Sequence, residues 1–163
     1  MPGGFDNSDF TISPARTKTE LISLAALLRA YAGALNIDLG PQGFEQELAA
    51  LPGPYAPPGG ELLLAKRGDH VLGCIGLKPL EPGVAEIKRL FVREQARGLG
   101  VGKALIEAII RTARELGYAE IKLDTLPQMQ SAIALYQAAG FKPIAPYGSH
   151  AYPGLVCFGK SLD

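Results

Sequence analysis

The residues best suited to chemistry form a glycine-rich turn at positions 97–103, with the sequence RGLGVGK. The segment before it, 87–92, has the β-branched and aromatic content of a strand. After it, apolar residues recur from 101 to 112 at the spacing of one helix face. The first amides of a helix have no internal partners, and glycine lets a ligand approach them closely. The turn therefore predicts an anion site, best suited to phosphate.

Two common phosphate-binding patterns do not match this turn. Walker A requires a hydroxyl residue where this chain has Ala104, and a first glycine where it has Arg97. The Rossmann fingerprint would require glycine in place of Lys103. The turn does match Arg-x-x-Gly-x-Gly, at Arg97, Gly100 and Gly102. It thus resembles the pyrophosphate-binding signature of the GCN5-related N-acetyltransferase (GNAT) superfamily, which holds acetyl-CoA.

A second motif follows at the distance seen in that superfamily. Residues 121–125 have the composition of a strand, and residues 131–139 indicate a short helix. The helix carries Leu-Tyr136 and is followed by Gly-Phe141, and this combination also resembles the superfamily. Many members have asparagine seven residues before the tyrosine, in contact with the pantetheine arm. This chain has Met129 there, which puts that contact in question.

The resemblance is strong over residues 85–141 and implies an acetyl-CoA-dependent N-acetyltransferase. It implies that the backbone amides of residues 90–92 polarise the thioester carbonyl. It also implies that Tyr136 protonates the departing thiol as a general acid. The alternative is a core tyrosine on an amphipathic helix. The implied cofactor-binding residues are Leu90, Phe91, Val92, Arg97, Gly98, Leu99, Gly100, Val101, Gly102 and Lys103.

Glu86 lies on the strand before the turn, where related enzymes often hold a glutamate that acts through water as the base. An amine with a pKa of about 10 must lose a proton before it attacks a thioester. Strand alternation places Glu86 on the same side as Lys88 and Leu90, so that it points along the groove where acceptor and thioester meet. The alternative is a charge that only pairs with Lys88 or Arg89.

The acceptor is expected to be a small-molecule amine or a peptide. In this superfamily the loop at 147–154 often borders the acceptor pocket, which makes Tyr147, His150 and Tyr152 the expected substrate-binding residues. A surface-loop histidine is the alternative for His150. The turn at 31–40 is the other expected wall, and neither segment has a dominant charge that would identify the acceptor.

Length and charge narrow the class of protein. The 163 residues are expected to form a single domain, 1–163, with one good core. With 16 basic and 16 acidic residues, the chain lacks the broad basic field of a nucleic-acid-binding protein. It has neither an apolar run long enough for a membrane span nor a secretory signal pattern. We therefore expect a cytoplasmic protein without a membrane or nucleic-acid partner, and the sequence leaves a homodimer open.

The cysteine and histidine content argues against metal and covalent chemistry. Cys74 and Cys157 lie in apolar, strand-like contexts and are expected to be buried free thiols. Two scattered histidines without clustered cysteines do not form a metal site. No base adjoins Cys74 in the sequence, so we expect direct transfer in a ternary complex and not an acyl-cysteine intermediate.

The elements that must position these residues follow from periodicity and turn signals. Periodicity alone indicates an α/β or α+β mixed fold. A capping box at Thr17 and Glu20 predicts the start of a first helix, and segments 61–66 and 71–77 predict a hairpin. The resemblance implies the order β-α-α-β-β-β-α-β-α-β-β, the single-domain acyl-CoA N-acyltransferase fold, in which helices flank a mixed central sheet.

Two other functions remain open at this point. The chain could bind acyl-CoA as a non-catalytic sensor or regulatory module, although such a module needs neither Glu86 nor Tyr136. A nucleotide-binding module is disfavoured by the failed Walker A and Rossmann patterns.

Overall fold

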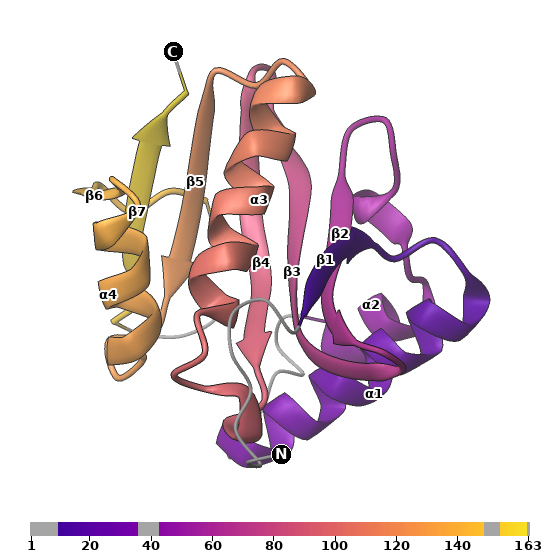
Figure 1. Ribbon diagram of the computed structural model, residues 1–163. Coiled ribbons are helices and arrows are strands. Elements are labelled where there is room, and N and C mark those ends of the chain that lie inside the picture. Colours follow the sequence, from indigo (N-terminus) through magenta and orange to yellow (C-terminus); the bar gives the residue numbers. More distant parts are fainter. Residues whose placement is uncertain (1–9, 36–42, 149–153, 163) are drawn as a thin grey trace.

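The computed structural model describes residues 10–35, 43–148 and 154–162, where a mixed sheet carries helices on both faces (Figure 1). The described strands and α-helices follow the expected order, and the short 3-10 turns η3 (Gly53–Tyr55) and η4 (Glu94–Ala96) precede β2 and α3. The elements are β1 (Thr11–Pro14), α1 (Lys18–Leu35), α2 (Phe44–Ala49), β2 (Glu61–Arg67), β3 (His70–Glu81), β4 (Val84–Val92), α3 (Val101–Glu115), β5 (Glu120–Thr125), α4 (Gln130–Ala138), β6 (Lys142–Ile144) and β7 (Val156–Ser161).

Local hydrogen bonds define the start of α1 and the end of α3. The amide of Thr17 donates to Glu20 Oε1 at 2.9 Å, and the amide of Glu20 donates to Thr17 Oγ1 at 3.1 Å. This is the expected capping box. At the end of α3, Gly117 has a φ of 91°, and the amide of Tyr118 donates to the carbonyl of Ala113 at 3.1 Å. Glycine allows this Schellman ending because it has no Cβ to clash.

The sheet has the strand order β1-β2-β3-β4-β5-β7-β6. Its neighbouring strands are antiparallel except for β4 and β5, which run parallel. These two strands pair only over residues 84–86 and 120–122. After the pair Glu86 and Lys122 the ladder stops, so the sheet opens at the C-terminal ends of its two parallel strands. Ligands commonly bind at such ends in α/β sheets.

Two apolar clusters cover the two faces of the sheet. The α3-side cluster joins α3 and α4 to residues such as Leu63, Ile75 and Ile121, and the α1-side cluster joins α1 and α2 to residues such as Leu62 and Leu64. Figure 1 shows α3 and α4 in front of the sheet. The alternation within β2 explains its continuous apolar run, because neighbouring leucines enter opposite clusters. None of the described helices is long and apolar enough to cross a membrane.

A bulge interrupts β4 immediately before the cavity described below. Gly76 of β3 pairs with Lys88, whereas Cys74 pairs with Phe91, so β4 has one more residue than β3 in this interval. Arg89 lies in the bulge with a φ of 63°, the only positive φ among the described non-glycine residues. The bulge therefore combines an irregular ladder with a left-handed backbone conformation.

The bulge corrects the expected side-chain alternation of β4. Glu86 and Lys88 lie on the same side, as predicted, because the Lys88 ammonium is 3.8 Å from Glu86 Oε2. Leu90, however, packs against the α3-side cluster together with Ile87. The prediction that Leu90 shares a side with Glu86 is wrong, because the extra residue at the bulge reverses the alternation beyond Arg89.

Candidate active site

A cavity of about 630 Å³ lies where the sheet opens, between the end of β4 and the starts of α3 and α4. All of the expected cofactor-binding residues line it except Leu99, which packs against the α3-side cluster. Further residues line the cavity beyond the predicted cofactor-binding set, and of these only Tyr31 (for the acceptor pocket) and Met129 (at the pantetheine position) were singled out in the sequence. The further residues are Tyr31 of α1, Ala96, Gln128, Met129, Gln130, Ser131, Ala132 and Leu135.

The start of α3 forms the polar end of this cavity. Gly98 and Gly100 have φ values of 83° and 84°, and Gly100 is the N-cap residue. No described side chain caps this end, so the first amides of α3 are available to an anionic ligand. Arg97 and Lys103 also line the cavity and add positive charge.

Gly102 brings α3 and α4 close together beside the cavity. A Cβ at this position would lie 2.8 Å from Leu135 Cδ1, closer than side chains pack. The third glycine of the turn therefore serves helix packing, whereas Gly98 and Gly100 shape the backbone. Met129 lines the cavity at the position where many superfamily members have asparagine, so a thioether replaces an amide in this wall.

Tyr136 is buried in the α3-side cluster and is not among the residues that line the cavity. Its ring packs edge-on against Phe141, with the ring centroids 5.6 Å apart. Burial raises the pKa of its phenol, so the hydroxyl keeps its proton at neutral pH. Among the described residues this hydroxyl has no hydrogen-bond partner, an arrangement that is rare for buried polar atoms.

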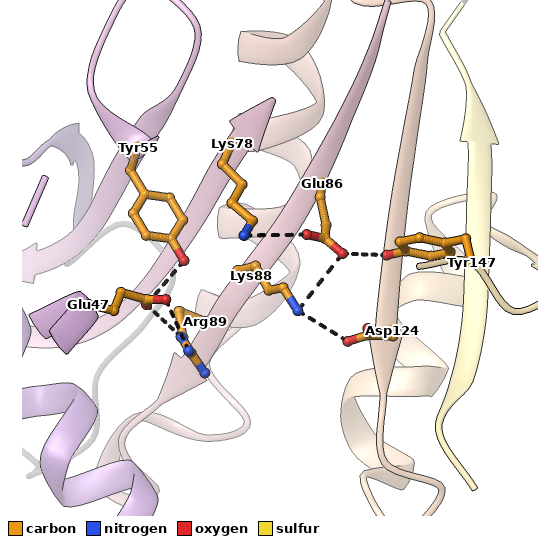
Figure 2. Close-up of polar contacts among 8 residues, drawn as sticks. All are labelled: Glu47, Tyr55, Lys78, Glu86, Lys88, Arg89, Asp124 and Tyr147. Carbon is orange, nitrogen blue, oxygen red and sulfur yellow. Dashed lines mark hydrogen bonds and ion pairs between the residues drawn. The ribbon is translucent and has the colours of Figure 1, made fainter. Parts of the chain in front are cut away.

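Glu86 is a buried carboxylate at the last residue pair between β4 and β5, with 4% of its surface exposed. The Tyr147 hydroxyl donates to its Oε2 at 2.6 Å. The ammonium groups of Lys78 and Lys88 each lie 3.8 Å from one of its oxygens. Figure 2 shows these groups converging on the carboxylate, with Asp124 on the far side of Lys88 at 3.4 Å.

Of the two charge partners considered for Glu86, Lys88 and Arg89, only Lys88 contacts it. The carboxylate does contact Lys88, as the charge-pair alternative supposes. Arg89 instead pairs with Glu47 of α2, at 2.8 Å between Nε and Oε2. Glu86 also lies outside the set of residues that line the cavity. Ala85 and Ile87 on either side of it belong to the α3-side cluster, so Glu86 and its polar surroundings lie on the sheet face opposite to α3 and α4.

Tyr147 is the expected acceptor-site residue that the structure brings to this polar group. Burial and the hydrogen bond to Glu86 raise the pKa of its phenol. The ammonium of Lys122 lies 5.4 Å from the centre of its ring. His150 and Tyr152 lie outside the described residues, as do residues 36–40 of the turn expected at 31–40. Residues 31–35 continue helix α1, so the turn does not begin at Tyr31 as predicted.

Sequence reasoning did not identify Lys78 and Asp124 beside Glu86, nor the group formed by Glu47, Tyr55 and Arg89. Lys78 is cross-strand from Glu86 in the β3–β4 register, so a correct hairpin register would have found it. The contacts of Asp124 with Lys88 and of Glu47 with Arg89 join residues 36 and 42 positions apart, and no local spacing signals them.

Both cysteines are buried and free, as expected. Burial raises the pKa of the Cys74 thiol to about 12, so it is protonated at neutral pH and is a poor nucleophile. Among the described residues no group of three or more histidine, cysteine, aspartate or glutamate side chains could hold a metal ion.

A mixed sheet that opens at an uncapped, glycine-rich helix start is the arrangement expected of acyltransferases that use coenzyme A thioesters. The sequence pattern of the acetyltransferase (GNAT) family matches residues 25–141. An uncharacterized N-acetyltransferase of Schizosaccharomyces pombe is 37% identical over 152 residues, which cover 91% of this chain and 93% of that relative. The chain therefore belongs to the acetyltransferase (GNAT) family and is an acyltransferase.

Solved structures agree with this fold. A GNAT-family acetyltransferase from Staphylococcus aureus has a TM-score of 0.79 and 23% identity, and the match covers 94% of this chain and 99% of that one. A GNAT-family acetyltransferase from Elizabethkingia anophelis with acetyl-CoA bound has a TM-score of 0.68 and 23% identity, covering 94% and 98% of the two chains.

Proposed function

We propose that this protein transfers an acetyl group from acetyl-CoA to an amine, directly, within a ternary complex. The observation that carries the proposal is the cavity at the opening of the sheet, which has the uncapped start of α3 at its polar end. The pyrophosphate of the cofactor would bind the amides after Gly98 and Gly100, beside Arg97 and Lys103. The structural relative with acetyl-CoA bound supports this choice of cofactor.

In the proposed reaction, the amine nitrogen attacks the thioester carbonyl carbon. The carbon–nitrogen bond forms, the carbon–sulfur bond breaks, and the amine proton passes to a base. Leu90, Phe91 and Val92 line the cavity, and their backbone amides would stabilise the developing oxyanion. Tyr136 would donate its proton to the departing sulfur, since its raised pKa keeps the phenol protonated and its hydroxyl has no hydrogen-bond partner among the described residues.

Glu86 would accept the amine proton, directly or through water. Its position at the last β4–β5 pair places it where the two strands part. Tyr147 orients the carboxylate through its short hydrogen bond, which favours one geometry for proton transfer. The acceptor is then expected to enter from the sheet face that carries this polar group, opposite to α3 and α4.

The acceptor is proposed only as a small-molecule amine or a peptide. A screen of both classes with acetyl-CoA, read by the release of free thiol, tests the proposal. Acetylation of an amine at a rate that depends on protein concentration would support it. If acetyl-CoA binds in calorimetry but no amine is acetylated, the non-catalytic acyl-CoA-binding module becomes the better reading. Tight binding of ATP without binding of acetyl-CoA would contradict both.

A further inference from the structure

The bulge in β4 requires an explanation beyond the proposed chemistry. Arg89 adopts a φ of 63°, in the left-handed region that is costly for residues with a Cβ. Such a conformation persists only where surrounding contacts hold it, and it often accompanies functional sites. The next three residues, 90–92, line the cavity. Whatever holds Arg89 in place therefore also sets the backbone that faces the cofactor.

The side chain of Arg89 is held by a bidentate ion pair with Glu47 of α2. Arg89 Nε lies 2.8 Å from Glu47 Oε2, and Nη2 lies 3.1 Å from Oε1. The guanidinium also lies over the ring of Phe44, 5.0 Å from its centre. The two charged side chains are only 8% and 17% exposed, so the pair is shielded from solvent and its geometry is specific.

Glu47 is fixed in turn by Tyr55, whose hydroxyl donates to Glu47 Oε2 at 3.1 Å (Figure 2). The Tyr55 ring lies against Gly76 of β3, where a Cβ would be 2.8 Å from Tyr55 Cε1. Gly76 pairs with Lys88, the last regular residue of β4 before the bulge. The same three side chains, Glu47, Tyr55 and Arg89, thus join α2, η3 and the bulge from one side of the sheet.

A further contact holds the backbone of the bulge itself. The thiol of Cys74 donates to the carbonyl oxygen of Arg89 at 3.3 Å. Cys74 also pairs with Phe91, the first regular residue of β4 after the bulge. Both the side chain and the carbonyl of Arg89 are therefore tied to neighbouring elements, and a relaxed conformation would break these contacts.

We propose that Glu47 and Tyr55, acting through Arg89, are positioning residues that hold the β4 bulge so that its backbone amides meet the thioester carbonyl. This inference rests on the proposed function for the identity of the ligand. It assigns a catalytic consequence to an ion pair that lies outside the cavity. A purely structural pair that only attaches α2 to the sheet is the competing explanation.

The test separates these explanations by two readouts, kcat and the carbonyl ¹³C resonance of bound [1-¹³C]acetyl-CoA. Polarisation by the bulge amides moves this resonance downfield of free acetyl-CoA. Glu47→Gln should lower kcat by about tenfold and return the resonance toward its free value, while the Kd of CoA, which lacks the acetyl group, changes less than about twofold. Glu61→Gln is the matched control, since Glu61 forms a bidentate pair with Arg16, at 2.6 and 2.8 Å, away from the bulge.

A second comparison tests whether the clamp, the contacts of Glu47 and Tyr55 that hold Arg89, acts on backbone conformation. Glycine adopts positive φ without steric cost, whereas alanine does not. The double variant Glu47→Gln with Arg89→Gly should therefore have a kcat about tenfold above that of Glu47→Gln with Arg89→Ala. Both double variants lack the same charges and differ at the strained position by one methyl group. Equal kcat values in the two would overturn the inference in favour of a purely structural pair.

The remaining outcomes are also decisive. A folded Glu47→Gln protein with wild-type kcat and resonance overturns the inference. If that variant does not fold, Tyr55→Phe replaces it, because it removes one hydrogen bond and keeps the ion pair. A smaller shift of the ¹³C resonance toward its free value supports the inference. An unchanged resonance overturns it. A wild-type resonance equal to that of free acetyl-CoA during active turnover overturns the inference and leaves the proposed function intact. If the resonance changes in Glu47→Gln but no amine is acetylated, the inference is supported and the proposed function is contradicted.

Discussion

Glu86 shows how one residue depends on its immediate neighbours. A carboxylate with 4% exposure loses most of its hydration, and two ammonium groups and a phenol replace it. The same contacts suit a charge pair and a preorganised base, two roles that differ in their kinetics. Single substitutions separate them, because a base acts in the transition state and a binding charge acts on the ground state as well.

Replacement of Glu86 by glutamine preserves the shape of the side chain and its ability to accept from Tyr147. If Glu86 is the proton acceptor, Glu86→Gln should lower kcat by about 10²-fold or more at neutral pH. Steady-state kinetics with a saturating amine measure this effect. Tyr147→Phe is the comparison variant: it keeps the carboxylate and removes the hydrogen bond that orients it, so its kcat should fall by less than that of Glu86→Gln. A raised KM for the amine with an unchanged kcat would instead make Glu86 a binding charge.

The hydroxyl of Tyr136 gives a second prediction at this scale. Tyr136→Phe should lower kcat by about 10²-fold and alter the KM for acetyl-CoA much less, because the hydroxyl acts on the departing sulfur. The raised pKa keeps the phenol protonated up to alkaline pH, so this loss should be constant from about pH 6 to 9. The variant should also unfold at no lower temperature, since it removes a buried hydroxyl without a described partner. A kcat within about twofold of wild type, with chemistry rate-limiting, would return Tyr136 to a core role.

At the scale of elements, the two ends of α3 serve different purposes with the same residue type. Gly100 and Gly117 both have left-handed φ values, 84° and 91°. Gly100 starts the helix beside the cavity, whereas Gly117 ends it where a Cβ would meet open space. An alanine at either position strains the backbone by about 1–2 kcal/mol. Alanine variants at these two glycines therefore distinguish the effect of backbone strain from the effect on ligand binding.

We expect Gly100→Ala to weaken the binding of CoA by at least about tenfold, because a methyl group enters the path of the phosphates. Gly117→Ala should lower the free energy of unfolding by about as much as Gly100→Ala does, about 1–2 kcal/mol, and should leave the Kd of CoA unchanged. Isothermal titration calorimetry and chemical denaturation measure the two quantities. Equal Kd values for the two folded variants would show that the start of α3 is not the phosphate site.

At the scale of the whole molecule, the cavity lies between elements that are not joined by strand pairing beyond Glu86. Its walls come from α1, β4, α3 and α4, while β4 and β5 pair over only residues 84–86 and 120–122. A ligand in the cavity would contact all of these elements at once. Binding that is confined to the native state stabilises it by mass action.

Acetyl-CoA at about 100 times its Kd should therefore stabilise the folded state by about 2.7 kcal/mol. For a domain of this size the Tm should rise by about 5–10 °C. Differential scanning fluorimetry with acetyl-CoA, CoA and ATP measures the effect. ATP should give a smaller rise, because it lacks the pantetheine arm that would occupy the apolar part of the cavity. Equal rises with ATP and acetyl-CoA would favour a general nucleotide site.

Much of the fold, and the glycine-rich part of the candidate site at the start of α3, can be predicted from local sequence. Thr17 and Glu20 determine the start of α1, and the spacing from Arg97 to Lys103 predicts both the start of α3 and its anion-binding role. These features depend on residues within one or two turns of each other, so their physical cause lies within the segment itself. The order of the described elements was predictable for the same reason, with the help of the family resemblance.

Tertiary structure alone decides what surrounds these segments. Tyr147 and Glu86 are 61 residues apart in the chain, and Arg89 and Glu47 are 42 apart, so no spacing rule connects them. The bulge at Arg89 reverses the alternation that a regular strand predicts for Leu90. Its left-handed φ occurs where contacts from α2 and β3 reach Arg89, and no local preference of arginine would produce it. The sequence by itself therefore predicted the start of α3 as the site for a phosphate, whereas packing between distant segments decided how Glu86 is surrounded and how the β4 backbone is presented to the cavity.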